Sequence, residues 1–270
     1  MPTLRANHID LHYTEHGSGP QTVVLSHSYV ADHTHFSPQI EALSKRYRVL
    51  AFDHRDHGRS GRATDRYTLQ TLVDDAIAVI EQTGAGPCHW MGLSTGGFVG
   101  MRIALQRPEL LRSLVLMDTS AEAEPRLARV RYEGMLLALR LVGVRPLMDQ
   151  TMKLMFGATS LADPDKAPLL AHWRDRMAAN DPHALIRFGK AIFSRGSVLD
   201  QLARVTVPTL VMVGTEDKAT TPDKARRIAE GIPGARLEVI PGAGHLSTLE
   251  QPDRINGLLQ GFLDGLSRPA

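Results

Sequence analysis

Short apolar runs alternate with amphipathic segments along this chain, and the two patterns predict different elements. The short runs, rich in aliphatic and β-branched side chains, predict buried strands at 22–26, 47–52, 88–93, 111–117, 209–213 and 237–240. Apolar residues at helical spacing predict helices at 36–43, 69–80, 96–106, 222–231 and 253–266. A weaker alternation over 3–15 predicts two short strands joined by a turn near Asn7.

Apart from the N-terminal pair, strands alternate with helices, and several of the strands are apolar on both faces, which is typical of a mostly parallel sheet covered by helices on both sides. One block, 122–200, breaks this alternation and is rich in Leu, Met and Arg. It predicts a helical insertion over the strand ends, although the block could also simply continue the core. We therefore expect an α/β fold with a core at 1–120 and 201–270 and a helical cap at 121–200.

Composition narrows the class of protein. The chain has 270 residues, with 31 Lys and Arg against 29 Asp and Glu, a net charge of +2 that argues against nucleic-acid binding through bulk charge. Its single cysteine, Cys88, excludes an intramolecular disulfide framework and a cysteine-based zinc cluster. We find no signal-peptide pattern and no apolar run of about 18 residues, so we expect a cytoplasmic protein without a membrane partner.

The segment Gly92-Leu93-Ser94-Thr95-Gly96 fits the pattern Gly-x-Ser-x-Gly, with an apolar strand before it and a predicted helix after it. A serine on a sharp strand-to-helix turn exposes its hydroxyl above the sheet. The glycines allow backbone and helix to approach closely, and the helix N-terminus supplies positive potential where an oxyanion forms. Ser94 is therefore the candidate nucleophile.

A nucleophilic serine needs a base, and the base needs an acid that orients it. His245 follows the last predicted strand in a glycine-rich loop, and Asp217 follows the strand at 209–213. The chain order Ser94, Asp217, His245 is that of the triads of α/β hydrolases. Asp118 also follows an apolar strand and remains an alternative acid, as does Glu216 with less support.

The remaining parts of a site can be assigned less directly. Backbone N–H groups of Tyr29, after the strand at 22–26, and Thr95 are the candidate oxyanion donors. His33 and His35, beside Asp32, look like metal ligands, but the sequence offers no further ligand set, so we expect solvated or hydrogen-bonded histidines and no metal. The candidate pocket residues are apolar residues of the helical block: Leu136, Leu137, Met148, Met152, Met155, Phe156, Trp173 and Phe188.

The chain resembles the small, capped, cofactor-free α/β-hydrolase superfamily over nearly all of its length outside the helical block. Within it, the chain looks most similar to the 3-oxoadipate enol-lactonase and carboxylesterase group. That group is similar in its oxyanion segment, here 26–28, and in the His-Leu-Ser run and the Glu-x-Pro that follow, here 245–247 and 250–252. The Ser-Thr-Gly-Gly at 94–97 also resembles non-haem haloperoxidases and arylesterases.

Two positions depart from the family pattern. Most relatives have His-Gly where this chain has His27-Ser28, which places a Cβ in the oxyanion loop. The segment 53–60 resembles the family's Asp-x-Arg-Gly-x-Gly-x-Ser, with Asp56 in place of the first glycine. Aspartate tolerates the left-handed backbone better than most residues, so we expect the turn to persist with a structural role.

The resemblance implies a serine hydrolase that cleaves a small carboxylic ester or lactone through an acyl-enzyme, without a cofactor, as a monomer or homodimer. The same triad also serves carbon–carbon bond hydrolases, although these usually carry Trp where this chain has Leu246. Perhydrolysis by a haloperoxidase-like site and a hydrolase-like small-molecule receptor remain open. Ser94 argues against epoxide hydrolases and haloalkane dehalogenases, whose nucleophile is Asp.

Overall fold

The computed structural model describes residues 2–266, and its centre is one eight-stranded sheet in the order β1-β2-β4-β3-β5-β6-β7-β8. All neighbours from β4 to β8 pair in parallel, whereas the N-terminal β1–β2 hairpin and the β2–β4 pair are antiparallel. The strands are β1 (Thr3–Ala6), β2 (Ile9–His16), β3 (Thr22–Ser26), β4 (Arg48–Phe52), β5 (Cys88–Leu93), β6 (Leu111–Met117), β7 (Thr209–Gly214) and β8 (Arg236–Ile240).

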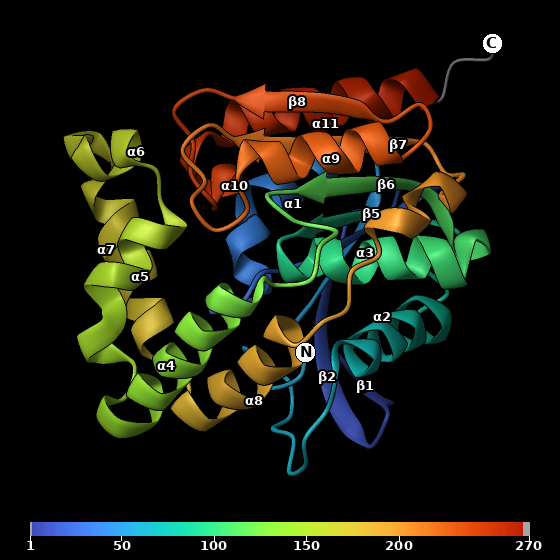
Figure 1. Cartoon of the computed structure of the whole chain (residues 1–270). Coiled ribbons are helices and arrows are strands. Elements are labelled where there is room, and N and C mark those ends of the chain that lie inside the picture. Colours follow the sequence, from blue (N-terminus) through green and yellow to red (C-terminus); the bar gives the residue numbers. More distant parts are fainter. Residues whose placement is uncertain (1, 267–270) are drawn as a thin grey trace.

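Helices cover both faces of this sheet, because its central strands are apolar on both faces. Along β3, Val24 belongs to one apolar core while Val23 and Leu25 belong to the other. The first core is closed by α2 (Leu69–Gln82), α3 (Thr95–Gln106) and α9 (Pro222–Gly231), and the second by α1 (Ser37–Leu43) and α11 (Pro252–Leu266). Figure 1 shows α3 and α9 in front of the sheet and α11 behind it.

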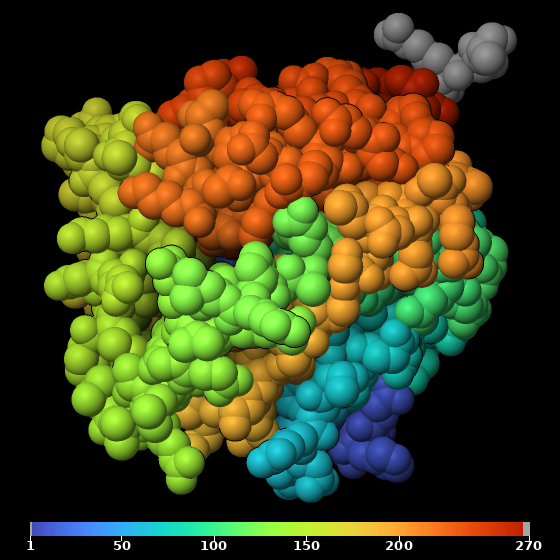
Figure 2. Space-filling model, viewed as in Figure 1, coloured from blue at the N-terminus to red at the C-terminus, as the bar shows by residue number. Residues whose placement is uncertain are grey.

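Five helices between β6 and β7 form a layer beyond the carboxyl ends of the strands, at the left in Figure 1. We call this segment, Arg126–Phe193, the helical insert. It comprises α4 (Arg126–Val142), α5 (Met148–Met155), α6 (Ala158–Ala162), α7 (Ala167–Ala178) and α8 (Pro182–Phe193). Figure 2 shows the insert, coloured from green through yellow to gold, against the orange segments that carry β7 and α9.

The sequence-predicted strands and core helices are all present, with ends shifted by at most a few residues. The patterns did not predict the one-turn helix α10 (Ser247–Glu250) or the short 3₁₀ helices, because a single turn is too short to show a period. These are η1 (His33–Phe36), η2 (Pro108–Leu110), η3 (Arg145–Leu147), η4 (Pro164–Lys166) and η5 (Leu199–Arg204). No helix in the described part of the chain is long and apolar enough to cross a bilayer.

Candidate active site

Ser94 stands at the sharp turn between β5 and α3. Its backbone lies at φ 53° and ψ −105°, outside the regions that non-glycine residues favour. The Ser94 N–H donates to the Met117 carbonyl (2.9 Å), and the Ser94 carbonyl accepts from the Thr119 hydroxyl (2.7 Å). The neighbouring strand therefore holds this residue in a strained conformation of the kind that is found at functional sites.

The glycines of the motif are required by close backbone approach. A Cβ on Gly92 would lie 2.2 Å from the carbonyl carbon of Gly96, and a Cβ on Gly96 would lie 2.0 Å from the carbonyl oxygen of Ser26. Neither position has room for a side chain. The turn can bring α3 against β3 and β5 only because both residues lack one.

His245 and Asp217 form a buried pair at the carboxyl ends of the strands. His245 Nδ1 lies 3.0 Å from Asp217 Oδ2, which also accepts from the Thr220 hydroxyl at 2.6 Å. Asp217 Oδ1 accepts the backbone N–H groups of Ala219 and Thr220 at 2.8 and 3.0 Å. Because the carboxylate accepts from Nδ1–H, the Nε2 of a neutral His245 is left as the basic nitrogen.

The two groups of this pair shift each other's pKa in opposite directions. Burial favours a neutral Asp217, but His245 and the hydrogen bonds from Thr220 outweigh it and lower the pKa of the carboxyl below its usual value. Burial also favours a neutral His245, yet the charge and hydrogen bond of Asp217 outweigh it and raise the pKa of the imidazole above 6.5. The arrangement stabilises a negative acid beside an imidazole that gains a proton readily.

The two alternative acids have other partners. Asp118 is fully buried, accepts from the Gly214 N–H and the Ser247 hydroxyl, and makes no hydrogen bond to His245. Burial and the nearby charge of Asp217 raise the pKa of Asp118 well above its usual value. Glu216 accepts from the backbone and hydroxyl of Thr159 in the helical insert. Asp217 is thus the carboxylate in contact with His245.

The peptide between Ser28 and Tyr29 is oriented by a buried histidine. His27 Nε2 accepts from the His54 N–H (2.9 Å), so Nδ1 carries the proton and donates to the Ser28 carbonyl (2.8 Å). Because a trans peptide points its C=O and N–H in opposite directions, the Tyr29 N–H faces away from His27. Ser28 has no positive φ, so its Cβ creates no backbone strain at this departure from His-Gly.

The two candidate oxyanion donors, the backbone N–H groups of Tyr29 and Thr95, both lack a hydrogen-bond partner among the described residues. Thr95 is the first residue of α3, where a backbone N–H has no partner inside the helix. Within residues 2–266, neither the Tyr29 N–H nor the Thr95 N–H donates to another protein group. Both donors are therefore available to a ligand.

Ser94 and His245 line the same cavity, which has a volume of about 770 Å³ and lies between the core and the helical insert. Tyr29, Phe98 and Thr220 contribute to its core side. The insert side is mostly apolar and is formed by residues of α4, α5 and α8, among them Met135, Leu139, Met148, Met155, Leu185 and Ile192. This is the size and character of a small-molecule site.

The structure places the predicted pocket residues in two groups. Met148 and Met155 line the cavity, whereas Met152, Phe156, Trp173 and Phe188 are buried outside its lining. Phe188, for example, packs 4.3 Å from the ring of His57 in the core, so its side chain joins the insert to the core. Of the two leucines, Leu136 is buried and Leu137 is 56% exposed on the outer face of α4, and neither lines the cavity. Apolar composition predicted burial in this block but not which buried side chains face the cavity.

The chain is similar to known proteins over most of its length. A family model described as the alpha/beta hydrolase fold matches residues 21–252. The chain belongs to the α/β-hydrolase family. It is 28% identical to the enol-lactonase from Burkholderia xenovorans, whose crystal structure superposes with a TM-score of 0.90 over 97% of this chain and 100% of that one.

Two further similar proteins are named as hydrolases of other types. A thermophilic esterase from Thermogutta terrifontis is 25% identical, with a TM-score of 0.91 and 99% coverage of both chains. The "Putative carbamate hydrolase RutD" of Azorhizobium caulinodans is 30% identical over 97% of this chain and 98% of that protein. These findings confirm the predicted family and fold, and they support a hydrolase.

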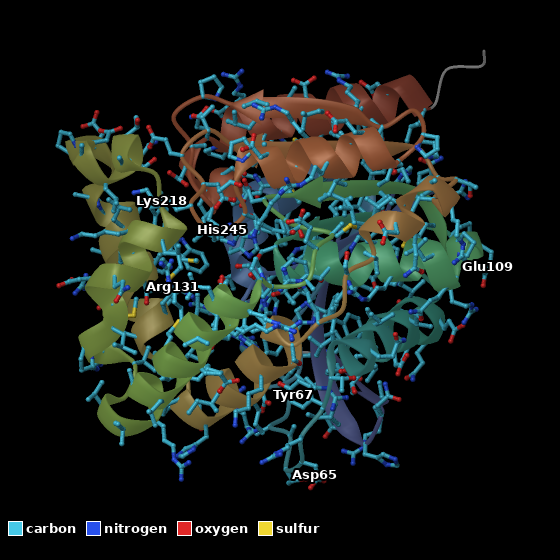
Figure 3. All side chains as sticks on the ribbon, viewed as in Figure 1. Asp65, Tyr67, Glu109, Arg131, Lys218 and His245 are labelled. Atoms are coloured by element: carbon cyan, nitrogen blue, oxygen red, sulfur yellow. The ribbon has the colours of Figure 1, made fainter. Side chains whose placement is uncertain are left out.

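The cavity of this α/β hydrolase also carries positive charge. Arg131 of α4, Lys218 of the loop after β7 and Lys224 of α9 contribute to its lining. Figure 3 shows Arg131, Lys218 and His245 near one another where the insert meets the core. A fourth cation, Arg195, is paired with Glu124 at 2.7 Å and buried.

Two functional residues were missed by the sequence analysis. Thr220 donates to Asp217 and fixes the carboxylate beside His245. Glu250 accepts the N–H of Gly244 (2.8 Å) and of Gly157 (2.9 Å), so it joins the loop of His245 to the insert. The Glu-x-Pro segment was visible in the sequence, but its hydrogen bonds join residues that are far apart along the chain.

Of the two loop histidines that were expected to be solvated or hydrogen-bonded, one differs from this expectation. His33 donates to Asp53, as expected of a hydrogen-bonded histidine, but His35 is buried with no hydrogen-bond partner on either ring nitrogen within the described chain. In the described residues the group of side chains that could hold a metal ion is His12, His33 and Asp53, and none of these three lines the cavity of Ser94.

Proposed function

We propose that this protein is a serine hydrolase that cleaves a small carboxylic ester or lactone through an acyl-enzyme. The observation that carries the proposal is that His245, hydrogen-bonded to Asp217, lines the same cavity as Ser94, which lies at a strained strand-to-helix turn. These are the nucleophile, base and orienting acid that acyl transfer requires. We also propose that residues 121–200 act as a cap that encloses the substrate.

In this mechanism Ser94 Oγ attacks the substrate carbonyl while His245 Nε2 takes the hydroxyl proton. Asp217 holds the imidazole in the required tautomer and stabilises its positive charge. His245 then returns the proton to the leaving alkoxide, and the acyl group remains on Ser94. A water molecule, deprotonated by His245, attacks the acyl carbonyl; as the bond to Ser94 Oγ breaks, His245 returns the proton to this oxygen, and the acid is released.

The tetrahedral intermediates need donors for the oxyanion. The free N–H groups of Tyr29 and Thr95 are our candidates, because both residues adjoin Ser94 or its cavity and neither group has a protein partner among the described residues. The hydrogen bond from His27 to the Ser28 carbonyl fixes the peptide that carries the first of them. This fixed peptide lets the donor stabilise developing charge without reorganisation.

One contact of the proposed mechanism forms only with substrate. No hydrogen bond joins Ser94 and His245 in the described structure. Catalytic hydrogen bonds are often long in the absence of substrate and tighten in the complex. The proposal requires Ser94 Oγ to come within hydrogen-bond distance of His245 Nε2 when substrate fills the cavity.

Carbamate hydrolysis is a second candidate, and the relatives support it. RutD proteins that are 26–30% identical to this chain over 92–97% of its length carry the name "Putative carbamate hydrolase". Attack of a serine on a carbamate carbonyl uses the same nucleophile, base and oxyanion donors. The positive charges at the cavity suit either substrate class if it carries a carboxylate.

The test is a turnover screen against matched aryl esters, lactones, carbamates and ring-fission diketones, with and without a carboxylate. We expect many turnovers on esters or lactones, and Ser94→Ala should lower them by about 10⁴-fold or more while leaving substrate binding largely intact. A serine-directed phosphonate should label Ser94, which mass spectrometry of peptides would locate.

Three other outcomes of this screen would indicate a different function. Preference for the carbamates would move the assignment to carbamate hydrolysis, and preference for the diketones would move it to C–C bonds. Binding without repeated turnover would favour a receptor, and activity that survives Ser94→Ala would remove Ser94 from the mechanism.

A further inference from the structure

A second constellation of chemically reactive side chains lies outside the cavity of Ser94. It brings together His12 in β2, His33 at the start of η1 and Asp53 directly after β4. One ring nitrogen of each histidine and one carboxylate oxygen of Asp53 lie within 4.8 Å of one another. The Asp53 N–H donates to the His12 carbonyl (2.9 Å) across the antiparallel β2–β4 pair, so the two residues face each other by strand register.

Burial of these groups is nearly complete. His12 is 2% exposed, Asp53 is fully buried, and the His33 side chain is 10% exposed. His12 Nε2 has no hydrogen-bond partner, although buried polar atoms are nearly always paired. A buried imidazole nitrogen beside a carboxylate and a second imidazole needs an occupant that accepts its lone pair or its proton.

We propose that His12, His33 and Asp53 bind a divalent transition-metal ion, with Zn²⁺ as the best match. Two imidazoles and one carboxylate form a ligand set that zinc uses with a water molecule in the fourth position. Ligand atoms around a tetrahedral zinc ion are about 3.4 Å apart. Atoms of the site that lie up to 4.8 Å apart therefore need to approach by up to about 1.4 Å, whereas His33 Nδ1 and Asp53 Oδ1, at 2.8 Å, need to separate by about 0.6 Å. Rotation of the two rings, whose centroids are 5.2 Å apart, supplies this movement.

Asp53 is already oriented as a ligand of such a site would be. Its Oδ1 accepts the backbone N–H of His33 at 2.8 Å, and Oδ2 accepts the backbone N–H of Arg59 at 2.9 Å. His33 Nδ1 lies 2.8 Å from Asp53 Oδ1, so a metal ion would replace the proton that now joins them. Hydrogen bonds from the surrounding backbone fix ligand orientation in metal sites and strengthen binding.

The position of the site indicates a structural role. None of its three residues lines the cavity of Ser94, so the ion would not contact the substrate. The chain from Ser26 to His33 connects β3 to the site and carries Tyr29 between them. A metal ion would therefore join β2, the end of β4 and the far end of the loop that holds the proposed oxyanion donor.

The experiment uses the full chain, freed of metal with a chelator that is then removed. Zn²⁺ or Co²⁺ alone is titrated, and binding is followed by calorimetry and by the visible spectrum of Co²⁺. We expect one equivalent to bind, a four-coordinate Co²⁺ spectrum and, at saturation, a Tm higher by about 5 °C.

Variants identify the ligands. His12→Gln and His33→Gln should each weaken binding at least tenfold. His16→Gln is the matched control, because His16 is an exposed histidine on the same strand and should bind metal as the wild type does.

Two results would overturn the proposal: no binding by the wild type, or equal binding by all variants, which would indicate an adventitious surface site. If either ligand variant fails to fold, anomalous diffraction at the zinc edge decides the question on the wild-type protein. Density between His12, His33 and Asp53 supports the site, and zinc bound only elsewhere refutes it.

Discussion

Two buried carboxylates near His245 are distinguished by their hydrogen bonds. Asp217 has four donors and the charge of His245 to stabilise its ionised form, whereas Asp118 has two donors and the repulsion of Asp217 against it. Two carboxyls so close cannot both ionise easily. The environment therefore assigns the negative charge to Asp217 and favours a neutral Asp118.

This difference predicts how two matched substitutions act. Asp217→Asn should lower kcat/KM by roughly 10³–10⁴-fold, because the amide no longer holds His245 in the productive tautomer. Asp118→Asn should lower it by less than about tenfold, since an amide resembles the neutral acid in size and hydrogen bonding. Circular dichroism should first show that both variants fold. The reverse ranking would assign the triad acid to Asp118.

The pH profile follows from the raised pKa of His245. The base must be neutral to accept the serine proton, so kcat/KM should rise with pH and reach half its plateau above the ordinary value of about 6.5. In Asp217→Asn the main group that raises this pKa is gone, although Asp118 and Glu250 also raise it, and the midpoint should move to lower pH. Rates measured from pH 5 to 9 in both proteins check this. A flat profile, or an upward shift in the variant, would contradict it.

At the scale of elements, one of the two positions where the chain departs from the family pattern, Asp56, joins the core to the insert. Asp56 keeps the left-handed turn, with φ 66°, and is fully buried at its side chain. It accepts from the Tyr67 hydroxyl (2.8 Å) and forms an ion pair with Arg187 of α8 (2.7 Å). A glycine could make the turn but not this connection.

Loss of the connection should be measurable as stability. Arg187→Gln leaves the Asp56 carboxylate buried with fewer partners, so it should lower the free energy of unfolding by about 1–3 kcal/mol. Arg174→Gln is the control, because its partner Asp149 is 81% exposed and such surface pairs contribute less than about 1 kcal/mol. Urea unfolding compares the variants. Equal losses of unfolding free energy in both variants would show that the Asp56–Arg187 pair stabilises the protein no more than a surface pair does.

At the scale of the whole molecule, the helical insert forms one side of the cavity that Ser94 lines, and the proposed cap role predicts a limit on substrate size. Each added methylene that is buried in the apolar wall contributes about 0.8 kcal/mol, or roughly fourfold in efficiency. Once the cavity is full, each further carbon should cost on the order of 1–3 kcal/mol, as in overpacked cores. We expect kcat/KM to peak for acyl chains of roughly two to eight carbons, within a cavity of about 770 Å³.

The measurement is a series of nitrophenyl esters from acetate to palmitate, each kept below its solubility limit. A peak followed by a steep fall supports a closed cavity. Efficiency that climbs steadily to the longest chains, or activation at an oil–water interface, would indicate an open lipase-like site instead.

The sequence by itself determined the order of strands and helices and the motif around Ser94. Both depend on consecutive residues. The strands β3 and β5 are short apolar runs, and the segment from Gly92 to Gly96 forms one turn in which the two glycines have no room for a side chain. Burial on both faces of a strand, and the absence of room for a Cβ, act over a few residues of chain. Such features leave a local pattern that can be recognised without coordinates.

Tertiary structure alone decided which carboxylate contacts His245, which methionines line the cavity, and that His12, His33 and Asp53 meet. Asp118 and Asp217 both follow apolar strands, and Met148 and Met152 are both buried on one face of α5, so no local pattern separates them. These contacts depend on rotamers and on the packing of segments that are distant along the chain. The sequence specifies these contacts only through the whole folded molecule, because each contact depends on how the other helices and strands pack.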